Sequence, residues 1–470
     1  MADDAATLAS PVPEAARAIL GGDPLTGAFT ARRSSHWFAG RPTPVEHPAT
    51  AWEALMAMPR SGKTVAYIHV PFCANHCLFC GFYRNPTRDP FSGPYSRALI
   101  QELEASADHP AVRSGPVHAV YFGGGTPTAL DEADLHRVIA AVRANLPLAP
   151  DCEITVEGRV HGFDDARIAA CLEAGANRFS IGIQTFDTAL RHRLGRKADR
   201  AGAEGMLAAL RARDQAAVVC DLIYGLPNQT LEMWRRDLRL VVDLGLDGVD
   251  LYALTLNPSS PLARSIEKGA LPPAADLPAQ ARFYAAGLET LDAAGWHHLT
   301  QAHWARTTRE RNLYNQLVKE QATCLAYGAG AGGLLAGHRY VLDSDEAAYR
   351  QRVAAGEKPL SMMFAPMPDL SARGAVAASL ETGRVSAEHL EARVGPGFAD
   401  RLAPVLAHWA QAGLLAPMPG GYALTPAGWF WQANLIAGLH AVMSQHRDGQ
   451  GAPLPPQQET PSHARRPHPG

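Results

Sequence analysis

Short apolar runs rich in β-branched and aromatic residues alternate with longer segments of helical periodicity along the first half of the chain. The runs span residues 65–70, 117–122, 152–157, 178–184, 217–224 and 248–255. The helical segments between them include 95–107, 131–145, 164–173, 201–213 and 231–244. Strands and helices that alternate at this interval predict a parallel sheet with right-handed crossovers. We therefore expect an α/β fold in which six units form an open, partial (β/α)6 barrel.

The pattern changes on both sides of residues 61–340, the predicted barrel domain. Residues 1–60 mix Pro, Ala and Gly with short apolar pieces, which predicts an N-terminal arm with little regular structure. An apolar piece at 296–304 is expected to close or extend the barrel. Residues 341–444 predict a smaller, mainly helical, winged-helix-like C-terminal domain, with helices at about 343–355 and 367–382. Within it, residues 385–430 predict two helices between 388 and 415 and then a hairpin-like end, a pattern similar to a small winged-helix module. The tail, 445–470, is rich in Pro, Gln, His and Arg and is predicted to be disordered.

Composition limits the partners of this chain. Its 470 residues carry a formal net charge of −3, so no basic field argues for nucleic acid or an anionic membrane surface. The C-terminal domain also has few basic residues, and we expect it to pack over the barrel mouth rather than to bind DNA. The acidic start lacks the features of a signal peptide, and no run approaches the roughly 20 apolar residues that span a bilayer. These observations predict a cytoplasmic protein without a nucleic-acid or membrane partner.

Three cysteines, Cys73, Cys77 and Cys80, follow the first apolar run at CxxxCxxC spacing. Three thiols this close cannot all form disulfides, and they indicate a metal site. A tetrahedral zinc site normally has a fourth Cys or His nearby, whereas three cysteines on a four-iron, four-sulfur cluster leave one iron open to another ligand. The spacing alone leaves both possibilities open. The remaining cysteines lie in apolar segments and are expected to be buried free thiols: Cys152, Cys171, Cys220 and Cys324.

Glycine-rich and polar positions mark the ends of the predicted strands. The run Gly123-Gly124-Gly125-Thr126-Pro127 follows the second strand, where glycines allow the backbone to approach a ligand closely. Glu157 and Gln184 end the third and fourth strands, and Asp221 lies in the fifth. Reactive groups of parallel barrels gather at the carboxyl ends of the strands, and buried polar groups need partners. We therefore expect a shared ligand there, although a hydrogen bond to a neighbouring loop would satisfy any one of these side chains.

The CxxxCxx(aromatic)C loop, with Phe79 before its last cysteine, resembles that of the radical S-adenosylmethionine (SAM) superfamily. The resemblance implies a [4Fe-4S] cluster on the three cysteines, whose open iron chelates SAM and whose electron cleaves it to a 5′-deoxyadenosyl radical. Residues 180–184, 194–196 and 221–227 resemble the oxygen-independent coproporphyrinogen III oxidase branch of that superfamily. By this likeness the SAM contacts fall on Tyr67, Phe79, Gly124, Gly125, Thr126, Glu157, Gln184, Arg196 and Asp221.

The branch contains porphyrinogen-decarboxylating enzymes, haem chaperones and anaerobic haem-degrading methyltransferases. Residues 157–161 read Glu-Gly-Arg-Val-His, where the oxidases and chaperones typically show Glu-x-Asn-Pro. Residues 301–315 and 23–26 instead resemble the anaerobic haem-utilisation group, whose best-known activity is anaerobilin synthase. That likeness implies a radical SAM methyltransferase that opens the porphyrin ring without oxygen and releases iron and a linear tetrapyrrole. Oxidative decarboxylation of coproporphyrinogen, or haem binding by a chaperone that keeps the cluster, are the alternatives.

A haem-sized substrate would need ligands for its iron and partners for its propionates. His and Tyr side chains can ligate iron, and Arg side chains can pair with carboxylates. The predicted substrate contacts are therefore His303, Arg306, Arg309, Arg311 and Tyr314. The family likeness further implies haem or a related tetrapyrrole as the substrate and a flavodoxin- or ferredoxin-type electron donor.

Overall fold

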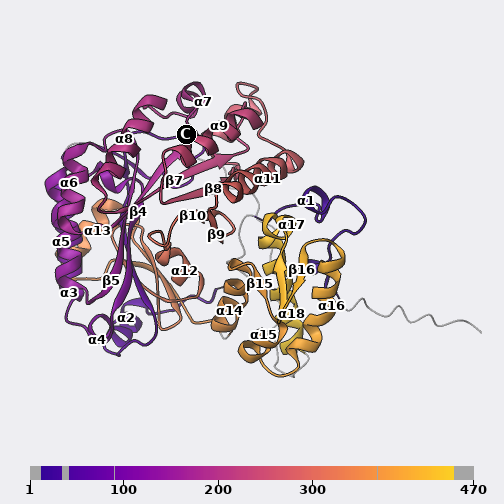
Figure 1. The fold of residues 1–470 in the computed structure, drawn as a ribbon. Helices are drawn as coiled ribbons and strands as arrows, with labels where there is room; N and C mark the ends of the chain where they lie inside the picture. The colour runs from indigo at the N-terminus through magenta and orange to yellow at the C-terminus, as the bar shows by residue number, and fades with distance from the viewer. Residues whose placement is uncertain (1–11, 34–41, 89, 368, 449–470) are drawn as a thin grey trace, which may run out of the picture.

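A twelve-stranded mixed sheet forms the centre of the computed structural model, which describes residues 12–33, 42–88, 90–367 and 369–448 (Figure 1). Its strands lie in the order β14-β13-β12-β11-β1-β4-β5-β6-β7-β8-β10-β9. The strands from β11 through β1 and β4 to β8 are parallel to one another. Their bounds are β11 Thr323–Tyr327, β1 Thr64–Val70, β4 Val117–Gly124, β5 Leu148–Gly158, β6 Arg178–Gln184, β7 Ala217–Tyr224 and β8 Gly248–Ala253. The sheet is open, and β14 and β9 lie at its two edges.

All six predicted strands are present, so the expected α/β fold with an open, partial barrel is confirmed. The segment predicted to close or extend the barrel extends it, as β10 His303–Ala305, antiparallel to β8, and β9 His297–Thr300, antiparallel to β10. The other edge is extended by β11 and by β12 Gly332–Leu335, β13 His338–Leu342 and β14 Leu360–Phe364. These strands were not predicted from the sequence, because they do not follow the regular alternation of strand and helix.

Helices join the parallel strands and surround the sheet (Figure 1). The longer ones are α3 Ser92–Ser106, α5 Glu132–Asn145, α6 Asp165–Ala174, α8 Arg200–Arg213, α9 Leu231–Asp243 and α11 Leu277–Ala293. The shorter ones are α4 Pro110–Arg113, η2 Pro127–Ala129, α7 Thr188–Arg193, α10 Pro261–Glu267, α12 Leu313–Lys319 and α13 Glu346–Ala354. The carboxylates of Asp164, Asp199 and Asp276 accept backbone N–H bonds at the starts of α6, α8 and α11, which fixes where these helices begin. None of the helices that the structure describes has the length and apolarity to cross a membrane.

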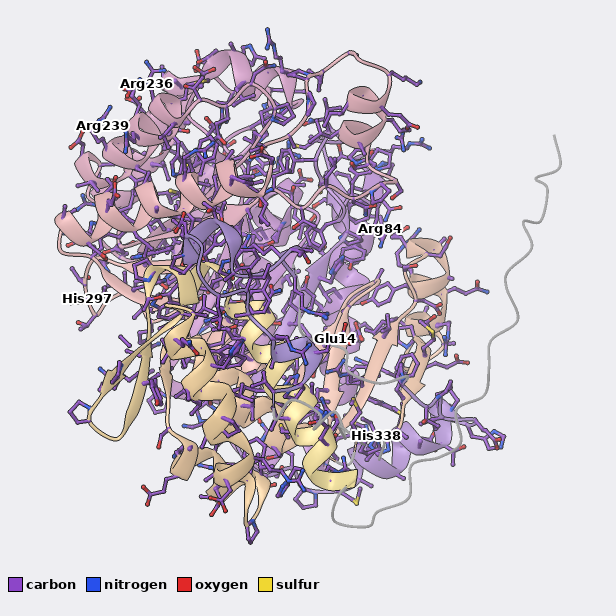
Figure 2. All side chains as sticks on the ribbon, turned by 90° about the vertical axis from the view of Figure 1, so that its right-hand side faces the viewer. Glu14, Arg84, Arg236, Arg239, His297 and His338 are labelled. Carbon is purple, nitrogen blue, oxygen red and sulfur yellow. The ribbon has the colours of Figure 1, made fainter. Side chains whose placement is uncertain are left out.

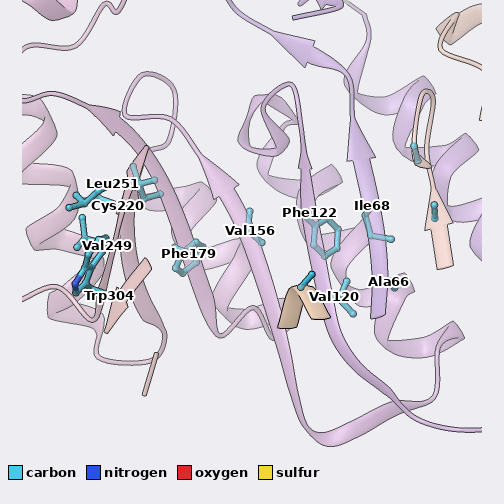
Figure 3. Close-up of a cluster of buried hydrophobic side chains, with 14 of the residues drawn as sticks. Ala66, Ile68, Val120, Phe122, Val156, Phe179, Cys220, Val249, Leu251 and Trp304 are labelled. Atoms are coloured by element: carbon cyan, nitrogen blue, oxygen red, sulfur yellow. The ribbon is translucent and has the colours of Figure 1, made fainter. Parts of the chain in front are cut away.

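The apolar core lies between these helices and the sheet (Figure 3). Phe122 on β4, Val156 on β5 and Phe179 on β6 are almost completely buried, and Trp304 on β10 continues the core beyond β8. A buried side chain of this size contributes about 1.5–3 kcal/mol. The four cysteines outside the cysteine loop are buried free thiols, as expected. The strands are thus held as a rigid support for the loops that follow them.

A smaller three-stranded sheet with helices forms the C-terminal part. Its order is α14 Leu370–Glu381, β15 Arg384–Val385, α15 Ala387–Val394, α16 Phe398–Gln411, β16 Leu415–Met418, β17 Gly421–Leu424, α17 Pro426–Phe430 and α18 Gln432–Asp448. The two helices expected between residues 388 and 415 are present as α15 and α16, and they are separated where Gly395 and Gly397 take positive φ. The predicted domain boundary at 340/341 falls inside β13. The predicted tail begins too early, since α18 continues to residue 448, and residues 449–470 lie outside the described part.

The first described residues of the predicted arm, 12–33, are anchored to the C-terminal domain, whereas α2 Pro48–Met56 packs against α4 and β14. The described part of the arm also contains η1 Glu14–Ala16 and α1 Pro24–Gly27, and residues 1–11 and 34–41 lie outside the described part. Glu14 begins η1, which packs against α18 (Figure 2). The indole of Trp409 donates to Ala16 O at 2.7 Å, and that of Trp431 donates to Pro24 O at 2.9 Å. The first residues described and the last helix of the chain therefore form one packed unit.

Candidate active site

A cavity of about 610 Å³ opens at the carboxyl ends of the parallel strands. The cysteine loop that follows β1 forms one part of its wall, and the ends of β4 to β8 form another. One lining residue from each of these strands is Gly124, Glu157, Gln184, Asp221 and Asp250, in strand order. The cavity therefore lies where parallel barrels carry their reactive groups.

The cysteine loop is held between β2 Phe72–Cys73 and β3 Asn85–Pro86, and its three thiols are free. Each sulfur has a polar partner: Thr126 Oγ1 lies 3.3 Å from Cys73 Sγ, Arg159 Nη2 donates to Cys77 Sγ at 3.2 Å, and Phe82 N donates to Cys80 Sγ at 3.3 Å. Such donors stabilise thiolates, the form in which cysteine binds iron. Burial raises the pKa of the Cys73 thiol, and a bound metal would offset that effect by its own charge.

Within the described residues, no three His, Cys, Asp or Glu side chains are grouped tightly enough to hold one metal ion. In a four-iron cluster each thiolate binds a separate iron, so the ligands stand further apart than those of a single zinc ion. The donor set here consists of three thiols, and none of their polar partners is itself a metal-binding side chain. This set fits three irons of a cluster.

Two polar side chains of the cavity wall carry buried atoms without a partner in the described structure. These atoms are Gln184 Oε1 and Arg196 Nε, and both residues line the cavity. Gln184 also has a φ of 73°, an uncommon left-handed backbone for a residue with a side chain. A buried polar group without a partner costs about 1–3 kcal/mol. A ligand with carboxylate, amino and hydroxyl groups, such as SAM, would satisfy them.

All predicted SAM contacts except Tyr67 line the cavity, and their contact with SAM remains a prediction. Tyr67 lies behind the wall, with its ring 6.5 Å from that of Tyr121 and its hydroxyl 3.0 Å from His69 Nδ1. Tyr121 itself lines the cavity. Tyr67 is therefore placed to support the wall through Tyr121.

The glycine run serves packing as well as access. A Cβ on Gly125 would lie 2.7 Å from the backbone oxygen of Phe72, and one on Gly124 would lie 2.6 Å from the His69 ring. Gly124 also has a φ of 110°, which side chains disfavour. These glycines let the loop after β4 pass directly against the start of the cysteine loop. The close backbone approach predicted at these glycines is thus, first of all, an approach to other segments of the protein.

Three carboxyl groups share the wall opposite the cysteine loop: Glu157, Asp221 and Asp250. Burial raises the pKa of Glu157, which accepts the Tyr121 hydroxyl at 2.7 Å. Burial and the neighbouring Asp250 raise the pKa of Asp221 to about 7. Like charges that are close together and poorly solvated disfavour ionisation. The wall can therefore hold protons near neutral pH.

The sequence analysis missed several residues of the wall, including Arg159, Tyr121, Ser180 and Asp250. Arg159 follows β5, and its contact with Cys77 shows that this segment reaches the cysteine loop. Asp250 lies in the apolar strand β8, the same signal that singled out Asp221 in β7. The signal for Asp250 was thus present in the sequence.

The predicted substrate residues lie outside the cavity lining, to which their segment contributes Asn315 instead. His303 is fully buried behind Asp250, with Nδ1 3.0 Å from Asp250 Oδ2 and Nε2 3.2 Å from Glu310 Oε1. Both contacts are within ion-pair distance, but neither meets the geometry of a hydrogen bond. The Arg178 guanidinium pairs with Glu310 at 2.9 Å and completes a buried charge network. An imidazole enclosed in this way has no room to ligate a haem iron.

The other predicted substrate residues have structural partners. Their partners are Leu246 O and Asp247 for Arg306, Asp214 for Arg309, Asp151 and Glu153 for Arg311, and the Tyr121 ring, 4.7 Å away, for Tyr314. The arginines pair with carboxylates of surrounding loops and strands, away from the cavity. The structure therefore gives no geometric support for substrate contacts by this set.

Comparison with known proteins gives a consistent assignment. Residues 67–241 match the model of the radical SAM superfamily. Anaerobilin synthase of Escherichia coli O157:H7 is 44% identical over 421 residues, which cover 88% of this chain and 93% of that protein. Haem chaperone HemW of Synechocystis is 32% identical over 59% of this chain and 67% of its own length. The oxygen-independent coproporphyrinogen III oxidase of Paracoccus denitrificans is 32% identical over 60% of this chain and 62% of its own length.

The same relationship holds in three dimensions. The solved structure of coproporphyrinogen III oxidase (HemN) from Escherichia coli superposes with a TM-score of 0.71, covering 84% of this chain and 93% of that chain at 24% identity. At this identity the likeness concerns the fold alone. The identity over most of the chain, the match to the family model and the cysteine loop at the mouth of an open barrel agree. The chain belongs to the radical SAM superfamily, in the branch that contains the oxygen-independent coproporphyrinogen III oxidases, the haem chaperones and anaerobilin synthase.

Proposed function

We propose that this protein is a radical SAM enzyme that degrades haem anaerobically, with methyl transfer and porphyrin ring opening, and releases iron and a linear tetrapyrrole. The observation that carries the proposal is the 44% identity to anaerobilin synthase, which extends over 88% of the chain and 93% of that relative. The other two kinds of relative match 59–60% of the chain. The likeness to anaerobilin synthase thus includes regions outside the barrel on which substrate choice can depend.

Different residues of the cavity would hold the cluster and orient SAM. Cys73, Cys77 and Cys80 would hold the [4Fe-4S] cluster, with SAM beside it. When bound, the cluster supplies the electron that cleaves SAM reductively. Arg159 donates to Cys77 Sγ at 3.2 Å, and the Arg196 guanidinium lies 3.9 Å from the same sulfur, so two cations stabilise this thiolate. The partnerless atoms of Gln184 and Arg196 would orient SAM.

The mouth of the cavity suits a flat apolar substrate. Phe82 and Tyr252 line it and remain 76% and 44% exposed, and Leu256, one residue beyond the lining residue Thr255, is 39% exposed. Large apolar side chains exposed together mark binding surfaces more often than chance positions. Aromatic rings stack on planar π systems, and a tetrapyrrole is such a system. The exposed rings beside the cysteine loop therefore support a tetrapyrrole substrate.

The experiment that tests the proposal is an anaerobic reaction of the reconstituted protein with haem, SAM and a reductant, followed by mass spectrometry of the products. A linear tetrapyrrole with free iron is the expected result. Coproporphyrinogen in the same assay tests the alternative that the protein is a coproporphyrinogen oxidase, which would form CO2 and vinyl products. Stoichiometric haem binding without any 5′-deoxyadenosine would mean a chaperone and would overturn the proposal.

We also propose a cytoplasmic location and a flavodoxin- or ferredoxin-type electron donor. The support is the family to which the chain belongs, whose chemistry consumes low-potential electrons. Replacing the chemical reductant by reduced flavodoxin or ferredoxin in the haem assay is expected to sustain turnover. Failure of both proteins, with a chemical reductant still active, would contradict the choice of donor.

A further inference from the structure

A buried charge network stands directly behind the wall of the cavity. Asp250 lines the cavity, and its side chain is 6% exposed. His303 lies behind it with no exposure, and Glu310, which is equally buried, lies behind His303. Arg178 closes the line at 2.9 Å from Glu310. The mechanism described above uses none of these four side chains.

The line joins strands β8, β10 and β6 of the same sheet and the segment after β10. Asp250 lies on β8, His303 pairs with it from β10, and Arg178 lies on β6. The titratable groups that face Asp250 and His303 come from all surrounding elements: Glu157 on β5, Arg178 on β6, Cys220 and Asp221 on β7, Tyr252 on β8, His298 on β9 and Glu310 after β10. Of these residues, Asp250 lies between His303 and the cavity.

Charge balance requires a proton in this network. Four carboxyl groups, those of Glu157, Asp221, Asp250 and Glu310, face two permanent cations, the guanidiniums of Arg178 and Arg196. Buried charges must be paired, and a group without a counter-ion takes up a proton instead. The carboxylates on both sides of His303 hold its pKa at about 9 despite its burial. The imidazole is therefore a further cation of this network at neutral pH.

A degraded haem must take up protons at its nitrogens. When iron leaves, each bond between iron and an anionic pyrrole nitrogen breaks, its electron pair stays on the nitrogen, and an N–H bond forms in its place. The protons must come from a donor at the cavity wall or from water. General acids placed in contact with substrate typically accelerate such transfers by 10²–10⁴-fold.

We propose that Asp250 passes a proton from His303, which lies behind it, to the tetrapyrrole in this cavity. The proposal rests on the proposed function, since it concerns the same site and substrate. In the step, the Nδ1–H bond of the His303 imidazolium breaks as an O–H bond forms on the Asp250 carboxylate, and that O–H bond breaks in turn as the pyrrole N–H bond forms. Iron keeps its oxidation state, so the step consumes no oxidant or reductant. Arg178 and Glu310 fix the imidazole from its other side.

The test compares Asp250→Asn and His303→Gln with the wild type in the anaerobic haem assay, recording linear tetrapyrrole, chelator-trapped iron and 5′-deoxyadenosine. In Asp250→Asn, tetrapyrrole and iron per 5′-deoxyadenosine are expected to fall about a hundredfold, while SAM cleavage and haem binding persist. The wild-type ratio should hold at neutral pH and fall as pH rises through about 9, where the imidazolium of His303 loses its proton. In His303→Gln that step in the pH profile should disappear.

The matched control is Asp247→Asn, which changes another buried carboxylate just before β8 that does not line the cavity. It should leave the ratio and the pH profile unchanged. An unchanged ratio in Asp250→Asn, or a pH profile of His303→Gln equal to that of the wild type, would overturn the inference. If Asp250→Asn does not fold, His303→Gln carries the test through its pH profile.

A second readout separates this inference from the proposed function. In ¹⁵N-histidine NMR of the reconstituted enzyme, the ring signal that is lost in His303→Gln should titrate near pH 9. Titration near the ordinary value of about 6.5 would overturn the inference whatever the enzyme produces. A wild-type enzyme that makes no tetrapyrrole from haem, with the His303 signal still titrating near pH 9, would refute the proposed function and, with it, the donation to this substrate.

Discussion

At the scale of single residues, the cysteine loop combines three thiols with donors that other segments supply. Cys77 is the most enclosed by cations, because Arg159 and Arg196 both reach its sulfur. The CxxxCxxC spacing in the sequence predicts a metal site on these three thiols. That spacing could not predict the two arginine contacts, because Arg159 and Arg196 lie more than one strand away and reach Cys77 only in the folded barrel.

Replacing Cys77 by Ala is expected to abolish the visible absorbance of the reconstituted cluster and SAM cleavage together, because a cluster bound by two thiolates loses an iron ligand. Absorbance, iron content and 5′-deoxyadenosine report the result. Cys171→Ala is the matched control, since Cys171 is a buried free thiol of α6 remote from the loop, and it should keep the cluster. A fully active Cys77→Ala enzyme would contradict the assignment of the cluster.

Arg159→Gln is expected to keep the cluster and to make it harder to reduce. The guanidinium lies 3.2 Å from Cys77 Sγ, and a neutral amide there would stabilise the more negative, reduced cluster less. A redox titration followed by EPR measures the potential, with Arg167→Gln in α6 as a control, since Arg167 pairs with Asp164 rather than with the loop. A potential in Arg159→Gln that equals or exceeds the wild-type value would contradict the role given to Arg159.

At the scale of elements, the loop after β4 and the cysteine loop fit together only through glycine. Gly125→Ala is expected to reduce cluster content, because its Cβ would lie 2.7 Å from the backbone oxygen of Phe72 and would displace the start of the cysteine loop. Gly205→Ala in α8 is the control: no atom lies within 4 Å of the added Cβ, and the exchange should stabilise the helix by about 0.5–1 kcal/mol. Iron content and thermal unfolding measure both. Normal iron content in Gly125→Ala would show that the loop tolerates the displacement.

The pair of Arg178 and Glu310 joins β6 to the segment after β10, and its stability depends on pH. The guanidinium and His303 lower the pKa of Glu310 to about 2 despite burial. Since this pKa is depressed below its unfolded value, the stabilisation is fully present above about pH 4.3 and is lost as pH falls toward 2. Glu310→Gln should destabilise the protein by about 3–5 kcal/mol at pH 7, the usual effect of unpairing a buried ion. Urea unfolding measures it, and a loss below 1 kcal/mol would show that the pair contributes little.

The elements also show where prediction from sequence succeeds and where it ends. Strands β1 and β4 to β8 were predicted because long buried runs recur at a regular interval. β11 was missed, because it has five residues and pairs with β1 across a separation of more than 250 positions. Asp221 was found and Asp250 was not, although both are carboxylates in buried strands. The substrate residues were chosen by chemical type, and their ion pairs with distant carboxylates cannot be read from a local pattern.

At the scale of the whole molecule, the two ends of the described chain pack together, since residues 12–33 contact the C-terminal helices. The replacement of Trp409 and Trp431 by Phe together removes the indole donors to Ala16 O and Pro24 O but keeps the apolar rings. Each lost bond leaves a carbonyl without its donor and costs about 1–3 kcal/mol. Amide hydrogen exchange is expected to rise in residues 12–33 and in α16 and α18, while the barrel strands stay protected. This follows because the lost bonds join only these segments.

Trp234→Phe is the matched control for that experiment, because the Trp234 indole donates to Phe283 O at 2.8 Å and so joins α9 to α11 beside the barrel. It should raise exchange in these two helices and leave residues 12–33 protected. If the double variant instead loosened the barrel strands, the terminal segment and the barrel would form one cooperative unit. Equal exchange in the double variant and the wild type would mean that apolar packing alone holds the segment. The expected pattern places the anchoring of the N-terminal segment in the two indole hydrogen bonds.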